Sequence, residues 1–370
     1  MKIAAVVSAL ETLAPPQWAA DWDNVGLLIG DAGGEVRKLL LCIDLTESVL
    51  AEARAAGAGM VMAYHPVIFK PLTRLTPSAA PVAYAAVRAN LAVYCTHTAL
   101  DAAPEGTHDA LADLLGLGDR RPLQAAWRKD QVKIVVFVRP EEASSVADAA
   151  FSAGGGQIGD YQRCAFFTHG VGMFYGPPGT HPTVGTIGRQ EATEELRLEI
   201  VAPRPAAAAV CQAIRGVHSY EQPAIDVYPL EDCPPGVGLG RLGQLDRPTA
   251  LPALLRRIRG GLHLKRLLVA PAQAGPRRGG SAISTVACCA GSCGSLMQAA
   301  LKEGAQLYLT GEMRHHDALA AAQAGMNVVC VGHSNSERLV LPHLAGRLRQ
   351  ILPKLQVVLS RQDRDPFEIL

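Results

Sequence analysis

Three consecutive segments decide the fold: LLLCIDL (39–45), TESVLAEARAAGAG (46–59) and MVMAYHPV (60–67). The first and third are short and almost continuously apolar, which is typical of strands that are buried on both faces of a sheet. The segment between them has the composition of a helix, and Thr46 is placed to cap its N-terminus. A strand, a helix and a second strand of this kind predict a parallel β-α-β unit.

The outer thirds of the chain repeat this alternation. After the opening unit, the first third continues with a helix at 81–90, a strand at 91–98 and a helix at 107–117, and we read residues 1–15 as a first helix. The last third has predicted strands at 264–272, 282–291, 306–312, 327–333 and 355–360, and helices at 295–305, 315–326 and 336–352. We therefore predict an α/β fold in which residues 1–125 and 241–370 form either halves of one unit or two similar lobes.

The middle third, residues 126–240, has a different pattern. Predicted strands at 132–140 and 196–203 each end near a proline, and an alanine-rich helix follows each of them. Two β-α-β units of this kind predict an inserted ferredoxin-like α+β domain. Between them, residues 166–188 are rich in glycine and proline, which predicts a long hairpin or an exposed loop.

Composition excludes several classes of protein. The 370 residues are 49% apolar with a formal net charge of +1, so the chain lacks the broad basic field of a nucleic-acid-binding protein. No apolar stretch reaches the roughly 18–20 residues that a membrane-spanning helix needs.

The nine cysteines are odd in number and lie mostly in apolar runs, which predicts reduced thiols in a cytoplasmic protein. The cluster Cys288, Cys289 and Cys293 lacks a second Cys/His pair for structural zinc, which favours packing cysteines.

Polar pairs follow three of the predicted strands: Tyr64 with His65, His97 with Asp101, and His333 with Glu337. Open α/β sheets bind ligands at the carboxyl ends of their strands. His333 and Glu337 are four residues apart, so they share one side of a strand-to-helix junction and could bind one divalent ion. The alternative is a capping histidine followed by a first-turn glutamate that the helix dipole favours. Three pairs at equivalent strand ends favour a metal site.

Weaker signals leave alternatives open. His315 and His316 begin a predicted helix, where they either line the site or form a solvated helix end. Residues 291–295 precede a helix and could hold an anion, but no Lys-Ser/Thr follows, so they are not a P-loop. Asp23 and Asn24 either reach the site or shape a turn.

Five motifs together resemble the Nif-three-like family, whose members are also called GTP cyclohydrolase type 2 homologues or dinuclear metal-centre proteins. They are WDNVGLLIGD (22–31), YHPVIFKPL (64–72), CTHTALDAAPEGTHDALADLLGL (95–117), TGEMRHHDALAA (310–321) and VGHSNSER (331–338). The middle third resembles the extra PII-like or CutA-like domain of longer bacterial members. The resemblance implies two α/β lobes, a toroidal homo-hexamer and a two-metal site.

The family's metal ligands fall on His65, Asp101, His333 and Glu337, and its remaining histidine falls on Tyr64. A phenol has a pKa of ~10 and is a poor zinc ligand at neutral pH. Tyr64 would bind a harder ion such as ferric iron, or hydrogen-bond to coordinated water, with His97 as the nearest spare imidazole. The expected cofactors are therefore one or two divalent ions per subunit, such as zinc, iron or manganese.

The resemblance and the strand-end residues together predict a metal-dependent hydrolase that acts on a phosphoester or a cyclic C–N bond of an unidentified small molecule. In this hypothesis His97 or His316 transfers the proton. The alternatives are a non-enzymatic protein that binds or carries metal, and a regulatory assembly with a degenerate site.

Overall fold

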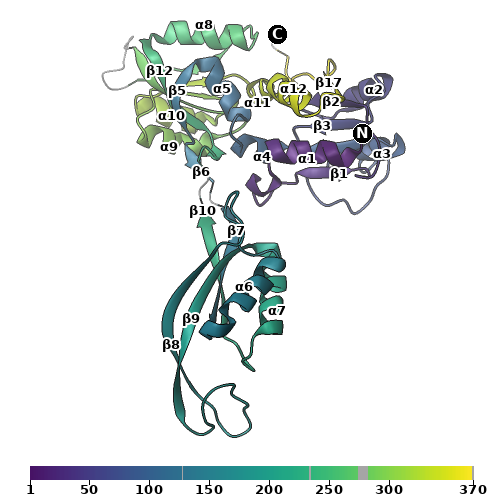
Figure 1. Ribbon diagram of the computed structural model, residues 1–370. Helices are drawn as coiled ribbons and strands as arrows, with labels where there is room; N and C mark the ends of the chain where they lie inside the picture. Colours follow the sequence, from purple (N-terminus) through teal and green to yellow (C-terminus); the bar gives the residue numbers. More distant parts are fainter. Residues whose placement is uncertain (127, 233–234, 274–281, 369–370) are drawn as a thin grey trace. The chain divides into compact units, whose positions relative to one another are not determined.

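The computed structural model describes residues 1–126, 128–232, 235–273 and 282–368, and its contacts divide the chain into two compact units (Figure 1). One unit combines residues 1–126 with residues 235–370, and the other is residues 127–234. The smaller unit lies within the range 126–240 that the sequence assigns to an insert.

The larger unit contains two main sheets, and the first has the strand order β1-β4-β3-β2-β17. Strands β17, β2, β3 and β4 run parallel, and β1 pairs antiparallel to β4. The strands are β1 (Gly26–Ile29), β2 (Lys38–Cys42), β3 (Met60–Ala63), β4 (Ala92–Cys95) and β17 (Gln356–Leu359). The helices around them are α1 (Ile3–Leu13), η1 (Pro16–Trp18), α2 (Glu47–Ala55), α3 (Pro81–Arg88), α4 (His97–Ala102) and α12 (Val340–Ile351).

Both faces of the first sheet are buried, as its continuously apolar strands predict. Met60 and Met62 of β3 pack with α1 and α12, whereas Val61 and Ala63 pack with α2 and α3. Because successive side chains on a strand point to opposite faces, every residue of β3 must be apolar.

The second sheet has the order β13-β16-β15-β14-β12-β5, in which β14, β15 and β16 are parallel. Its strands are β5 (Leu117–Arg121), β12 (Arg241–Thr249), β13 (Leu268–Ala270), β14 (Ile283–Cys289), β15 (Leu307–Thr310) and β16 (Asn327–Cys330). A small ladder joins β6 (Gln124–Ala125) to β11 (Gly238–Leu239). The helices are α5 (Thr107–Leu115) and α8 (Leu251–Gly261) on one face, α9 (Met297–Lys302) and α10 (His315–Gln323) on the other, and η4 (Gly294–Leu296) and α11 (His333–Glu337) in connections.

Each main sheet receives one strand from the opposite part of the chain. β17, near the C-terminus, pairs with β2 of the first sheet, and β5, from the first third, pairs with β12 of the second. The lobe ranges 1–125 and 241–370 expected from the sequence therefore exchange edge strands in the structure.

The smaller unit has the element order β7 (Arg128–Val138), η2 (Pro140–Glu142), α6 (Ala143–Ser152), β8 (Ala165–Tyr175), β9 (Gln190–Pro203), η3 (Arg204–Ala206), α7 (Ala207–Val217) and β10 (Ile225–Asp232). Its sheet is antiparallel throughout, in the order β10-β7-β9-β8. Ile134 and Ile200 belong to the core between this sheet and both helices, which lie on the same side of it (Figure 1). Among the described residues of this unit, no helix lies on the opposite face of the sheet (Figure 1).

Eight of the nine cysteines lie in the described part of the chain, and all eight are free thiols. Cys288 and Cys289 are buried in the cores of the second sheet, as expected for packing residues. Within the described ranges, none of the helices has both the length and the apolar character that crossing a bilayer requires.

Candidate metal centre

Three predicted ligands converge where the carboxyl ends of strands from both main sheets meet. His65 follows β3 of the first sheet, and His333 and Glu337 belong to α11, which follows β16 of the second. One potential ligand atom from each of the three residues lies within 4.8 Å of the other two. The strand-end pattern therefore locates a group of side chains that could hold a metal ion.

Carboxylates orient both imidazoles. His65 donates from Nδ1 to Asp44 Oδ1 at 2.9 Å, and His333 Nδ1 lies 3.4 Å from Glu312 Oε1. This leaves both Nε2 atoms facing Glu337, with His65 Nε2 3.4 Å from Oε2 and His333 Nε2 3.2 Å from Oε1. Metal-binding histidines commonly donate their second ring nitrogen to a carboxylate in this way.

Glu337 supplies the strongest evidence for a cation. Its side chain is buried, and its Oε2 forms no hydrogen bond of good geometry in the described chain, where its nearest basic group is His65 Nε2 at 3.4 Å. A poorly satisfied buried carboxylate oxygen is costly, and a divalent ion between the three side chains would reduce that cost. Two imidazole nitrogens and a carboxylate also form a donor set that suits zinc, iron or manganese. The residues present therefore fit a metal ion.

The pKa shifts of Glu337, His65 and His333 are those expected of a cluster that attracts positive charge. Burial raises the pKa of Glu337, but the His333 and His65 imidazoles outweigh burial and hold it below its usual value. Burial lowers the pKa of His65, but Asp44 and Glu337 outweigh burial and raise it to about 10. Contact with Glu337 likewise raises the pKa of His333 despite burial. A metal ion would compete with protons for these imidazoles.

The turn after β14 fits closely against the ligands. Gly291 has φ +70°, and a Cβ there would lie 2.9 Å from Glu337 Oε1 and 3.6 Å from His333 Nε2. Ser336 Oγ accepts a hydrogen bond from Gly291 N at 2.8 Å and donates to the His333 carbonyl at 2.6 Å. The glycine therefore makes room for the carboxylate, and the serine ties the turn to α11.

Tyr64 and Asp101 interact with each other and are not part of the converging group. The Tyr64 hydroxyl donates a hydrogen bond to Asp101 Oδ1. Burial and the negative charge of Asp101 raise the pKa of Tyr64 well above its usual value, so it is a neutral phenol at neutral pH. Burial also raises the pKa of Asp101 to about 6, while the hydrogen bond from Tyr64 acts in the opposite direction. This pair occupies the positions where the family resemblance expects two metal ligands.

His97 lies beside the converging group. Its ring centroid is 5.3 Å from that of His65 and 5.7 Å from that of Tyr64. His97 donates from Nδ1 to Asp23 at 2.7 Å, and the backbone N–H of Thr98 donates to the other Asp23 oxygen at 3.1 Å. Burial raises the pKa of Asp23, but the hydrogen bonds from His97 and Thr98 outweigh it and lower the pKa. The hydrogen bond to Asp23 makes Nδ1 the donor nitrogen, so the lone pair of a neutral imidazole here would lie on Nε2.

The structure does not bring His316 to this group. His316 is exposed in the first turn of α10, where its ring packs against His315 at a centroid distance of 5.3 Å. None of the contacts found in the described chain joins it to His65 or His333.

Sequence reasoning missed the supporting residues Asp44, Glu312 and Ser336. Asp44 had a usable signal, because it directly follows the apolar run 39–43 at the same sheet edge as His65. Glu312 and Ser336 had no comparable signal, since their roles depend on how the turn after β15 and helix α11 pack.

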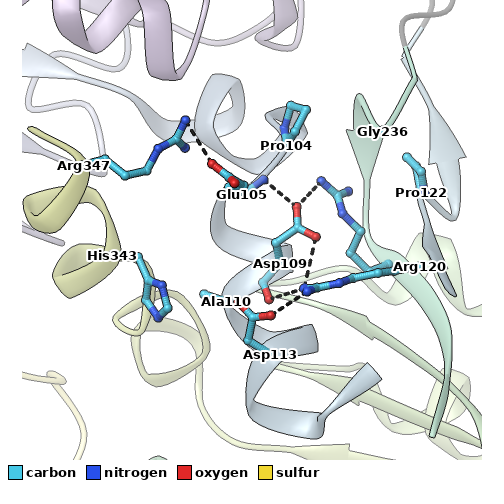
Figure 2. Close-up of a pocket in the computed structure, with 11 residues that line it drawn as sticks. Pro104, Glu105, Asp109, Ala110, Asp113, Arg120, Pro122, Gly236, His343 and Arg347 are labelled. Carbon is cyan, nitrogen blue, oxygen red and sulfur yellow. Dashed lines mark hydrogen bonds and ion pairs between the residues drawn. The ribbon is translucent and has the colours of Figure 1, made fainter. Parts of the chain in front are cut away.

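A separate cavity of about 470 Å³ lies around α5, and Figure 2 shows the residues that line it. Its three carboxylates each contact a guanidinium: Asp109 contacts Arg241, Asp113 contacts Arg120, and Glu105 contacts Arg347. Because each of these carboxylates already pairs with an arginine, and no imidazole nitrogen of the described chain converges on them, the cavity does not offer the ligand set found at Glu337.

Comparison with known proteins gives consistent matches over the whole chain. The sequence profile of the family described as Duf34/NIF3 (NGG1p interacting factor 3) matches residues 1–366. A Halalkalibacterium halodurans protein named GTP cyclohydrolase 1 type 2 homolog is 32% identical, and the match covers 100% of both chains. NIF3-like protein 1 of Rattus norvegicus is 33% identical over 100% of this chain and 93% of its own. The crystal structure of a Bacillus cereus protein related to NIF3 superimposes with a TM-score of 0.71 at 30% identity, covering 100% of this chain and 99% of that one.

Proposed function

Because the chain belongs to the Duf34/NIF3 family, we propose that it is a metal-dependent hydrolase acting on a phosphoester or a cyclic C–N bond. The buried Glu337 carboxylate, with an unsatisfied oxygen between two oriented imidazoles, is the observation that carries this proposal. The name GTP cyclohydrolase 1 type 2 homolog, which several relatives carry, is compatible with C–N hydrolysis. Nothing in the site selects GTP.

In this proposal His65, His333 and Glu337 hold one divalent ion. Such an ion supplies Lewis acidity that polarises the electrophilic centre of the substrate. His97 takes the proton from the attacking water at Nε2, because Nδ1 is held by Asp23. Asp23 then stabilises the imidazolium that forms, and it orients the ring throughout.

We further propose one ion per subunit, where the family resemblance implies two. The support is the hydrogen bond between Tyr64 and Asp101, which gives the second subsite a neutral phenol and a carboxylate that already has a donor. This pairing also favours the alternative function, a protein that binds or carries metal without turnover, because hydrolysis by two ions needs both subsites.

Two proposals concern architecture. The order β10-β7-β9-β8 with both helices on one face supports a ferredoxin-like, PII- or CutA-like insert.

A homo-hexamer is supported by the exposed apolar side chains Trp22, Phe69, Leu72 and Leu75, which a monomer would leave in water. Light scattering coupled to size-exclusion chromatography measures the subunit number directly.

The test of function combines metal analysis with hydrolysis of bis(p-nitrophenyl) phosphate and a nucleotide panel. We expect Glu337→Gln and His333→Ala to lose both bound metal and activity, because each loses a ligand. His97→Gln should keep the metal but lose about 10²–10⁴-fold in kcat, the usual contribution of a general base. Asp101→Asn should keep the single ion.

Two controls sharpen this test. Glu105→Gln, in the separate cavity around α5, should leave metal content and activity unchanged. Wild-type protein that holds stoichiometric metal but hydrolyses nothing in the panel would favour the non-enzymatic alternative. Unchanged metal content in both Glu337→Gln and His333→Ala would refute the site.

A further inference from the structure

A cavity of about 480 Å³ lies within the unit of residues 127–234, on the sheet face that the helices leave uncovered. Strand register gives its position. Val136 and Val138 face the helices, so Phe137 between them faces the cavity. On β9, Leu198 and Ile200 face the helices, so Glu195 lies on the cavity side.

The walls of the cavity are mostly apolar and aromatic. β8 contributes Phe174 and Tyr175, β7 contributes Phe137, and the segment after α7 contributes Tyr220. The connection between β8 and β9 forms a further side of the cavity. Two hydrogen bonds hold this connection in place. The backbone N–H of His181 donates to Glu221 at 3.0 Å, and the hydroxyl of Thr183 donates to the Ser219 carbonyl at 2.6 Å.

A buried carboxylate points into this apolar space. Glu195 is 9% exposed, and its Oε1 accepts a hydrogen bond from the Tyr220 hydroxyl at 2.7 Å. Gly172 makes room for the other oxygen, since a Cβ there would lie 2.1 Å from Glu195 Oε2. Among the side chains that the structure describes, no lysine, arginine or histidine comes within ion-pair distance of Glu195.

Glu195 has one neutral donor, Tyr220, and no countercharge among the described side chains, so its negative charge can attract a cation that enters the cavity. The Arg197 guanidinium, which pairs with Glu199, already lies 5.6 Å from the centroid of the Phe137 ring, and the other aromatic walls offer further faces that attract organic cations. Among the described residues that line the cavity, none is basic and could attract an anion. A metal ion suits the cavity less well, because hard cations need several oxygen ligands and Glu221 is already engaged by His181.

We propose that this cavity is a binding site for an organic cation, an ammonium or amidinium group carried on an apolar body. The cationic group pairs with Glu195, and the apolar body packs between Phe137, Phe174 and Tyr220. The volume falls within the roughly 300–1,000 Å³ typical of small-molecule sites. The site is separate from the metal centre and does not depend on the hydrolase proposal.

The test uses benzylammonium as the probe, with benzyl alcohol and benzoate as neutral and anionic analogues of similar shape. Saturation-transfer NMR and calorimetry on the full-length protein measure binding. We expect benzylammonium to bind, benzyl alcohol to bind at least tenfold more weakly, and benzoate not to bind. Glu195→Gln, which keeps the shape and the acceptor for Tyr220, should weaken benzylammonium binding at least tenfold.

Two further variants test whether binding depends on the Glu195 carboxylate itself or on any negative charge nearby. Gly172→Ala should also weaken binding, because its Cβ displaces Glu195. Glu194→Gln removes an exposed charge on the adjacent residue and should change nothing. The proposal is overturned if benzylammonium does not bind the wild-type protein, if benzoate binds equally well, or if Glu195→Gln binds as the wild type does. Metal content should be equal in all these variants. A negative binding result would therefore count against the cation site and would not bear on the proposed metal centre.

Discussion

At the scale of single residues, we expect Tyr64 to limit how many ions the proposed site holds. Tyr64→His would place a neutral nitrogen ligand beside Asp101 and remove the phenol that now donates to it. We expect the metal-to-protein ratio, measured by elemental analysis, to rise from about one to about two, the number a two-metal site would hold. Tyr64→Phe removes the hydroxyl without adding a ligand, so its ratio should stay near one. An unchanged ratio in Tyr64→His would show that position 64 does not limit the second subsite.

His108 should make stability depend on pH. It is fully buried and accepts a hydrogen bond from Ala290 N at 3.1 Å. Burial, with a contribution from the charge of Arg241, lowers its pKa to about 3. The unfolded chain, in which histidine has a pKa of ~6.5, therefore binds a proton that the folded chain does not. The free energy of unfolding should fall by up to ~1.4 kcal/mol per pH unit as the pH is lowered from ~6.5 to about 3, and this residue should contribute little slope outside that range.

Urea denaturation at pH 7.5, 6.5 and 5.5 measures this dependence. His108→Asn keeps an acceptor for Ala290 N but cannot titrate, so the difference in slope between the two proteins isolates the histidine. Equal slopes below pH 6.5 would contradict the prediction.

At the scale of elements, the turn after β14 should control metal affinity through steric contact. Gly291→Ala would place a Cβ 2.9 Å from Glu337 Oε1 in a left-handed backbone conformation. Gly304→Ala has a similar φ of +75° but open space around the new Cβ. Both variants should lose roughly 1–2 kcal/mol of stability from backbone strain. Only Gly291→Ala should also weaken metal binding, measured by competition with a chelator, and equal affinities would show that the turn does not position Glu337.

Local sequence was sufficient to predict most elements but not their partners. The run 60–63 predicted β3 because its burial on both faces requires apolar residues throughout. Nothing in the run 355–360 could place β17 beside β2, since that pairing joins residues more than 300 positions apart. The same limit applies to the site. The convergence of His65 and His333 could be predicted from strand ends, whereas the hydrogen bond between Tyr64 and Asp101 depends on tertiary packing.

At the scale of the whole molecule, the candidate metal centre lies between the two main sheets. His65 belongs to the first, and His333 and Glu337 follow a strand of the second, so a bound ion would link elements that are joined at this point by the contact of His65 with Glu337. A ligand that binds only the folded state stabilises it by about 2.7 kcal/mol when its free concentration is 100 times Kd.

Metal removal should therefore loosen residues 1–126 and 235–370 and leave residues 127–234 unaffected. After treatment with a chelator, we expect faster hydrogen exchange at the β3–His65 junction and in α11, because the ion no longer restrains their separation. We also expect a Tm lower by roughly 5 °C or more. His333→Ala, which lacks a ligand, should show the fast exchange already and should not respond to the chelator. Exchange that accelerates equally in residues 127–234, or a His333→Ala protein that still responds, would mean that the chelated metal is not bound between the two sheets.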